Sequence, residues 1–158
     1  MEQNATSLDT EQLEERYERE RLKRIADGPH TYRSLRDLDI DFDADPFAPP
    51  LTRDPLVEET DVVVVGSGWA GMTTAASLTK QGVTSYRIID KAGDFGGTWY
   101  WNRYPGCMCD VDATIYLPLL EETGYMPTEK YASASEIFGY AQRLGRHFGL
   151  YDHALFQT

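Results

Sequence analysis

VVVVGSGWAG, at residues 62–71, is the stretch of sequence that decides the expected fold. Its four successive valines predict a strand that is buried on both faces of a parallel sheet. A Gly-x-Gly-x-x-Gly pattern follows at Gly66, Gly68 and Gly71, and a helix is expected over about residues 69–81. In this pattern the first glycine permits a tight turn, the second lets the backbone approach a pyrophosphate, and the third lets the helix pack closely on the sheet.

A second strand over residues 86–89 ends at Asp90 and completes a βαβ unit of about 30 residues. An acid at this position accepts hydrogen bonds from an adenosine ribose, whereas it would repel the 2′-phosphate of NADP. The pyrophosphate would bind the free amide groups at the positive end of the helix. The motif therefore predicts a site for FAD or NAD and leaves both open. The alternative is a glycine-rich turn that binds no nucleotide.

The chain as a whole is expected to be an α/β protein. A Rossmann-like βαβ unit with parallel strands in an incomplete sheet would follow a helical and extended N-terminal arm. We place the domain boundary between an acidic extension, residues 1–60, and the first part of a nucleotide-binding domain, residues 61–158. Within the extension, a helix over about residues 8–26, capped by Asp9 or Thr10, precedes a proline-rich extended arm.

The second half of the chain alternates loops and regular elements. Residues 91–132 are rich in glycine, proline and aromatic residues, which predicts ordered loops. Ser133 and Glu136 then form a capping box, which begins a helix that reaches to about residue 148. Residues 154–158 have the composition of a further strand.

Charge and hydropathy exclude several classes of protein. The formal net charge is −11, and the first 60 residues carry 16 of the 26 acidic side chains and 8 of the 15 basic ones. This acidity argues against a nucleic-acid partner, which requires a basic surface. No run approaches the roughly 18 apolar residues of a membrane span, and the N-terminus lacks the apolar stretch of a signal peptide. We therefore expect a cytoplasmic protein without a membrane partner.

No metal site is predicted. Cys107 and Cys109 have a Cys-x-Cys spacing without a second pair to complete a zinc site, so we expect reduced thiols. The alternating aspartates of residues 37–45 lack the glycine and the distal glutamate of a calcium loop. The three histidines form no ligand pattern.

The string GGTWYWNRYPGCMCDVD, residues 96–112, chooses between the cofactors. Two successive glycines let the backbone run close to a ligand, and the following aromatic residues can enclose a large planar ring. This string resembles the segment after the first Rossmann motif of Baeyer–Villiger monooxygenases, which are class B flavoprotein monooxygenases. The resemblance runs from about Asp61 to the end of the chain, and it favours FAD.

The resemblance implies a set of cofactor-binding residues in this chain: Gly66, Gly68, Trp69, Ala70, Gly71, Asp90, Lys91, Gly97, Thr98, Trp99, Tyr100, Trp101, Met108, Cys109, Asp110 and Tyr116. Thr98 to Trp101 would lie along FAD, and Met108 and Cys109 would border the nicotinamide of NADPH. Asp110, the candidate catalytic residue, would support an arginine near the flavin.

Simpler roles stay open for several of these residues. Trp99 and Trp101 can be core aromatics, and Cys109 can be a small packed residue. Asp110 can cap a turn or pair with Arg103.

The resemblance implies a function as well. In this family, NADPH and O₂ are used to insert oxygen next to the carbonyl of a small-molecule ketone, which gives an ester or a lactone. A second Gly-x-Gly-x-x-Gly for NADPH and a catalytic arginine in its family context are missing from the sequence. We therefore expect an FAD-binding fragment that is inactive alone. The alternatives are a segment of a flavin-dependent N- or S-oxygenase, a non-catalytic dinucleotide-binding remnant, and an NAD-dependent oxidoreductase domain.

Overall fold

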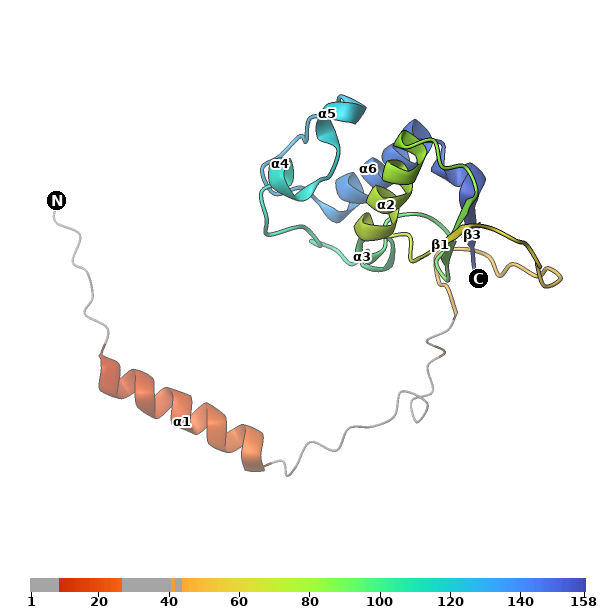
Figure 1. Cartoon of the computed structure of the whole chain (residues 1–158). Coiled ribbons are helices and arrows are strands. Elements are labelled where there is room, and N and C mark those ends of the chain that lie inside the picture. The colour runs from red at the N-terminus through yellow and green to blue at the C-terminus, as the bar shows by residue number, and fades with distance from the viewer. Residues whose placement is uncertain (1–8, 27–40, 42–43) are drawn as a thin grey trace. The chain divides into compact units, whose positions relative to one another are not determined.

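The computed structural model describes residues 9–26, 41 and 44–158 (Figure 1). The chain divides into two compact units, residues 1–42 and 43–158. The first unit contains α1 (Thr10–Ala26), and the helix predicted here is thereby confirmed. Most of the predicted proline-rich arm before residue 44 lies outside the described residues. No helix in the described part of the chain is long and apolar enough to cross a membrane.

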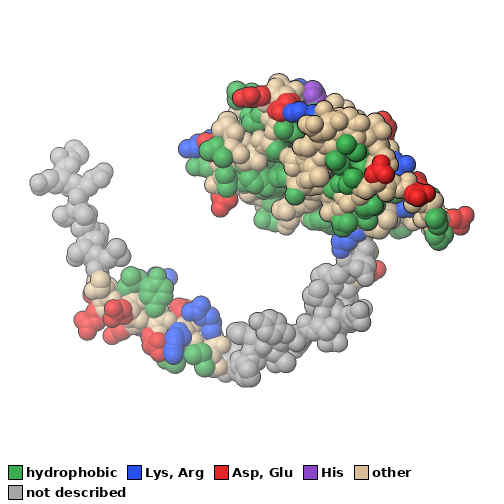
Figure 2. Space-filling model, in the orientation of Figure 1, with side chains coloured by type: hydrophobic (Ala, Val, Ile, Leu, Met, Phe, Trp, Pro, Cys, Tyr) green, Lys and Arg blue, Asp and Glu red, His purple; other side chains and the backbone are tan. Residues whose placement is uncertain are grey.

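Helix α1 begins at a side-chain cap. Asp9 Oδ1 accepts hydrogen bonds from the amides of Glu11 and Gln12, at 3.1 and 3.3 Å. The helix carries both acidic and basic side chains (Figure 2), and Arg19 Nη1 lies 3.8 Å from Glu15 Oε2, an ion pair between residues four apart. Of the two capping residues that the sequence allowed, the structure selects Asp9.

A three-stranded parallel sheet in the order β1-β2-β3 is the base of the second unit. The strands are β1 (Val62–Val65), β2 (Tyr86–Asp90) and β3 (Ala154–Phe156). The helices of this unit are α2 (Trp69–Lys80), α3 (Thr98–Trp101), α4 (Ala113–Tyr116), α5 (Leu120–Thr123), α6 (Ala134–His147) and the 3-10 helix η2 (Leu150–His153). The predicted α/β class, with a Rossmann-like βαβ unit and an incomplete parallel sheet, is confirmed.

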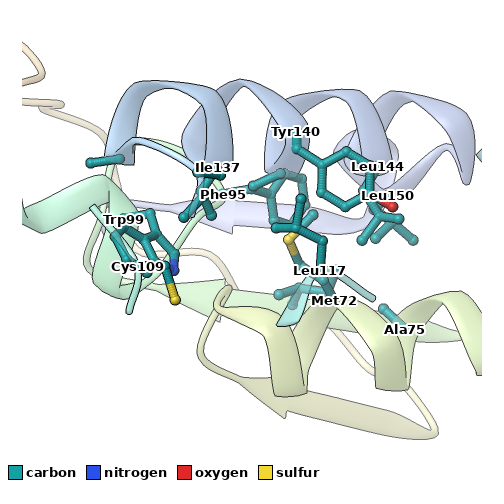
Figure 3. Close-up of a cluster of buried hydrophobic side chains, with 14 of the residues drawn as sticks. Met72, Ala75, Phe95, Trp99, Cys109, Leu117, Ile137, Tyr140, Leu144 and Leu150 are labelled. Carbon is teal, nitrogen blue, oxygen red and sulfur yellow. The ribbon is translucent and has the colours of Figure 1, made fainter. Parts of the chain in front are cut away.

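The core of this unit lies between the sheet and two helices, α2 and α6 (Figure 3). Met72 and Ala75 of α2 and Ile137 and Leu144 of α6 are fully buried, and so is Phe95 from the loop after β2. Hydrophobic burial of this kind supplies most of the favourable free energy of folding. It therefore fixes α2, whose first turn carries the glycine pattern, against the sheet.

The opposite face of the sheet is only partly covered. The side chains of Val63 and Val65 are 53% and 81% exposed, whereas Val64 is buried. The prediction that the valine run is buried on both faces is therefore wrong for the outer face. Residues 51–60 run along this face without regular structure, and a groove of about 480 Å³ lies between them and the strands. Two valines that a second layer would cover in a complete parallel sheet thus face solvent.

Two local predictions need correction. Residues 91–132 contain three helices of four residues each, α3, α4 and α5, which are too short to produce a hydrophobic period. Ser133 Oγ accepts from the Glu136 amide at 3.3 Å, as a capping box requires. The Glu136 carboxylate, however, accepts from Tyr125 and Thr128 instead of returning to Ser133. The preceding loop brings these donors to Glu136, so only half of the predicted capping box forms.

The segment that precedes β1 is attached to the core through Tyr100. The Tyr100 hydroxyl donates to Asp45 Oδ2 at 2.6 Å, and the Phe47 ring packs edge-on against the Tyr100 ring. The pKa of Tyr100 is raised to about 12, mainly by burial and secondly by the hydrogen bond to Asp45. Burial opposes the charge of Asp45, but hydrogen bonds from Tyr100, Phe47 and Gly93 outweigh it and lower the pKa of Asp45.

We expect Gly71→Ala to destabilise the second unit. A Cβ at position 71 would lie 1.9 Å from the carbonyl oxygen of Gly66, so α2 would have to move away from β1. The free energy of unfolding, measured by urea denaturation, should fall by about 2 kcal/mol or more. Gly139→Ala is the matched control. Its Cβ meets nothing within 4 Å in α6, and it should stabilise the chain by roughly 0.5–1 kcal/mol. An unchanged midpoint for Gly71→Ala would contradict the close approach of α2 and β1.

The free energy of unfolding should also depend on pH in the alkaline range, because of Tyr100. Its pKa of about 12 in the folded chain lies above the ordinary value of 10.0, so its hydrogen bond contributes fully below pH 10.0 and is lost as pH rises toward 12. Tyr100→Phe should lower the free energy of unfolding by about 1–2 kcal/mol at neutral pH. The difference from wild type should shrink over that alkaline window. Tyr131→Phe, at a side chain that is 44% exposed, is the control and should match wild type throughout. A difference for Tyr100→Phe that is independent of pH would argue against the Asp45 contact.

Candidate functional site

The turn that joins β1 to α2 is rich in glycine, so much of its backbone carries no side chain. Gly66 has a φ of +100°, which favours glycine, and its amide donates to the Ile89 carbonyl at 2.8 Å. Gly68 is the N-cap of α2, and among the described residues no side chain caps this end and no acid lies in the first turn. The first-turn amides of α2 are therefore not bonded to a capping side chain of the described residues, which is the arrangement that receives an anion.

A second glycine segment lies against this turn. A Cβ at Gly97 would be 2.7 Å from the Cα of Gly68, and a Cβ at Gly68 would be 3.5 Å from the Cα of Gly97. The Gly96 amide also donates to the Ser67 carbonyl at 3.1 Å. The two segments, which the sequence predicts separately, thus meet and form a cradle made of backbone. A cradle without side chains lets a ligand come close to the backbone.

Asp90 connects this turn to the end of β2. Its Oδ2 accepts from the amide and the hydroxyl of Ser67, at 2.5 and 2.6 Å, and its Oδ1 accepts from the Ala92 amide at 2.8 Å. A carboxylate has about four acceptor positions, so these three bonds leave one for a further donor such as a ribose hydroxyl. Asp90 is therefore a structural link and still has room for the predicted ligand contact.

Ser67 is the residue of this turn that the sequence reasoning missed. It is fully buried, and its hydroxyl also lies 3.3 Å from the Asp94 carbonyl oxygen. The available signal was its place between two glycines, where a small side chain with a donor can satisfy the carboxylate at the end of the next strand. Ser67 therefore belongs to the candidate site even though it faces the protein interior.

Three of the predicted aromatic residues gather next to the turn. The Trp99 indole N–H donates to the Tyr116 hydroxyl at 2.8 Å, and the Tyr116 ring packs edge-on against both Trp99 and Trp69. The Trp69 ring also contacts Tyr140, at 5.9 Å between centroids. Trp69 Nε1 is buried and has no hydrogen-bond partner within the described chain. A buried donor without an acceptor is costly, so this N–H suits a site that a ligand acceptor completes.

A cavity of about 360 Å³ lies next to this aromatic group, and Trp99, Cys107, Met108 and Phe138 are among its lining residues. Cys109, two residues after Cys107, is also buried, and its amide donates to the Ala132 carbonyl at 3.0 Å. The cavity therefore brings together two predicted site residues, Trp99 and Met108. Asp110 is exposed and is not among the residues that line it.

Arg103 packs against aromatic rings instead of pairing with Asp110. Its guanidinium lies 4.1, 4.6 and 4.5 Å from the ring centroids of Phe47, Tyr100 and Phe138. Its Nε donates to the Tyr100 carbonyl at 2.8 Å. Among the described residues, Arg103 forms no ion pair with Asp110. This arginine therefore has a packing role.

The remaining predicted residues lie at the margin of the cradle. Ala70 and Thr98, in the first turns of α2 and α3, are exposed. The Lys91 ammonium lies 5.2 Å from the Trp101 ring centroid, and the Trp101 ring packs edge-on against Tyr100. Over the described ranges, no group of three or more His, Cys, Asp or Glu side chains is placed to hold a metal ion.

The comparisons with known proteins agree with this geometry. Residues 64–126 match a family described as an NAD(P)-binding Rossmann-like domain. The chain is 51% identical over 157 residues to Baeyer-Villiger monooxygenase 4 of Dietzia sp. (strain D5), covering 96% of this chain and 25% of that protein. It is 52% identical over 154 residues to Baeyer-Villiger monooxygenase ATR8 of Stachybotrys chlorohalonatus, again covering 96% of this chain and 25% of that protein.

Solved structures give the same result. The polycyclic ketone monooxygenase from Thermothelomyces thermophila is 41% identical with a TM-score of 0.62, over 66% of this chain and 18% of that one. A steroid monooxygenase bound to NADP is 38% identical with a TM-score of 0.56, over 62% of this chain and 19% of that one. By sequence and by fold, the chain is therefore identified with the N-terminal segment of the Baeyer–Villiger monooxygenases, and it spans about a quarter of the length of the relatives that it matches.

Proposed function

We propose that this chain binds FAD and forms the FAD-binding segment of an NADPH- and O₂-dependent monooxygenase that inserts oxygen next to a ketone carbonyl. The observation that carries the proposal is the backbone cradle of Gly68 and Gly97 at the uncapped end of α2. The name of one relative, a polycyclic ketone monooxygenase, supports a ketone substrate. A cytoplasmic location belongs to the same proposal.

The residues of the site would divide the binding of FAD among them. The amides of the first turn of α2, with Gly68 and Gly97, would hold the diphosphate. The remaining acceptor position of Asp90 would take a ribose hydroxyl. Trp69 and Trp99 would lie along the ring system, and the buried Trp69 N–H would then find its missing acceptor. The bound flavin would supply the redox chemistry, and this chain would position it and exclude water around it.

The roles proposed for residues 108–110 follow from the family resemblance and from where these residues lie. Asp110 is exposed, so it would be accessible to an arginine of the complete enzyme near the flavin. Met108 is 51% exposed at the cavity beside Trp99, and with Cys109 it would border the nicotinamide. The sequence contains one Gly-x-Gly-x-x-Gly, so the second dinucleotide would be bound mostly by residues outside this chain.

The first test is an FAD titration of the purified chain, followed by flavin fluorescence, with Gly68→Ala beside wild type. Gly68 has φ −78° and ψ −170°, which alanine adopts, and the added Cβ would lie 3.5 Å from Gly97, an ordinary contact. The fold should therefore be unchanged while the methyl group occupies the path of the diphosphate. We expect saturable binding by wild type, weakened roughly tenfold or more in Gly68→Ala, which is about 1.4 kcal/mol.

Gly139→Ala, at an exposed position of α6, controls for the glycine substitution itself and should bind FAD like wild type. Equal FAD affinities for Gly68→Ala and wild type would remove the cradle from the binding site. Preferential binding of NAD would replace the flavin proposal with a dehydrogenase-type domain.

The isolated chain should have no oxygenase activity of its own. With FAD, NADPH, O₂ and a cyclic ketone present, NADPH oxidation and ester formation should equal the background of free FAD. The physical reason is that the cavity beside Trp99 is open to solvent at Tyr104 and Met108, which are 62% and 51% exposed, so water is not excluded. A rate of ester formation above the free-flavin background would show that this segment is sufficient for catalysis.

A further inference from the structure

A short segment before β1 holds the loop that carries the candidate FAD site. We call residues 45–51 the strap and residues 90–97 the cofactor loop. Asp45 Oδ2 accepts from the Gly93 amide at 2.9 Å, in the middle of the cofactor loop, and from the Tyr100 hydroxyl at 2.6 Å. Asp45 Oδ1 accepts from the Phe47 amide at 2.8 Å, which fixes the direction of the carboxylate. One charged side chain of the strap thus receives three donors.

The strap also packs directly on the loop. A Cβ at Gly93 would lie 2.5 Å from the Cβ of Ala48, 2.7 Å from the Tyr100 hydroxyl oxygen and 3.2 Å from Asp45 Oδ2. There is therefore no room for a side chain at position 93 while the strap is in place. The glycine at this position is explained by the strap, since Gly93 is not among the glycines with a positive φ.

Gln157, just after β3, attaches the other end of the strap. Its side-chain oxygen accepts from the Leu51 amide at 2.7 Å, and its side-chain nitrogen donates to the Pro49 carbonyl at 3.1 Å. Its own amide donates to the Ala92 carbonyl, in the cofactor loop, at 3.1 Å. Gln157 has a φ of +53°, which costs energy for a residue other than glycine and persists where surrounding contacts enforce it. Both ends of the strap are therefore connected to the same loop.

The cofactor loop connects the strap to the candidate site. It begins at Asp90, which holds Ser67, and it ends at Gly97, which forms one side of the cradle. Binding sites require that the groups contacting the ligand are held by a supporting set of residues. The hydrogen bonds of Asp45 described above reach Gly93 and Tyr100 and not the glycine turn at residues 66–71, so Asp45 would act on the ligand through the loop.

We propose that the strap positions the dinucleotide site and that Asp45 is its positioning residue. Asp45 holds Gly93 and Tyr100, and in doing so it sets the separation of Gly97 from Gly68. Asp45 itself contacts no ligand. This inference rests on the proposed FAD-binding function and adds to it a residue outside the glycine motifs.

The test compares FAD affinity among variants of the strap in the full chain. Asp45→Ala removes the acceptor for Gly93 and Tyr100, and it should weaken FAD binding roughly tenfold, about 1.4 kcal/mol. Asp45→Asn keeps one oxygen that can accept from Gly93 and Tyr100, so it should recover most of the affinity. Asp54→Ala removes an exposed carboxylate three residues after the strap; it is the control and should bind FAD like wild type.

Hydrogen exchange without FAD provides the structural readout. In Asp45→Ala, exchange of the amides of residues 93–97 should accelerate by a larger factor than exchange of the amides of α6 and of α2 beyond its first turn. This pattern would separate a positioning role from a general loss of stability alone, which would accelerate exchange by the same factor in all these elements. If Asp45→Ala does not fold, Tyr100→Phe and Asp45→Asn carry the comparison, because each keeps part of the contact.

The outcomes distinguish the positioning role of Asp45 from the proposed FAD-binding function. FAD binding by wild type that is undiminished in Asp45→Ala overturns the positioning role and leaves the FAD site intact. The same loss of affinity in Asp54→Ala as in Asp45→Ala also overturns the positioning role. Failure of the folded wild-type chain to bind FAD overturns the proposed function, and the positioning role with it.

Discussion

The close approach of α2 to β1 is the constraint on which the rest of the structure depends. The position of a Cβ at residue 71 is 1.9 Å from the Gly66 carbonyl oxygen, so only glycine lets the helix start directly above the end of the strand. That placement puts Ser67 within reach of Asp90 and puts Gly68 against Gly97. The first turn of α2 thus presents its amides at the point where the strand, the helix and the cofactor loop meet.

The site has two parts that differ in what makes them. The cradle is backbone, and its geometry follows from glycines and from the Ser67–Asp90 hydrogen bonds. The wall beside it consists of side chains, with Trp99 donating to Tyr116 and Trp69 packed between aromatic neighbours. The cradle suits any dinucleotide, since a diphosphate requires only amides and space. The aromatic wall is the part that matches a large planar ring.

Features encoded over a few neighbouring residues could be predicted from the sequence. The glycine pattern, the valine strand, the 12-residue α2 and the amphipathic α6 each occupy one continuous stretch, and all four form. The contacts of Asp45 could not be predicted, because its partners Gly93 and Tyr100 lie 48 and 55 residues away. Ser67 was missed for a similar reason, since its acceptor is 23 residues distant. Exposure of Val63 and Val65 depends on what covers a sheet face, and a run of valines carries no information about that.

Within the described part of the chain, β1 is one of the two edge strands of the sheet, and its outer face carries two exposed valines. An edge strand with free amide and carbonyl groups beside apolar side chains is a template on which another strand can add. When a further segment of polypeptide occupies that position, the sheet gains a neighbour and the valines are removed from water. When none does, copies of the chain compete for the same edge. Through this edge, the unit would therefore self-associate more as its concentration rises.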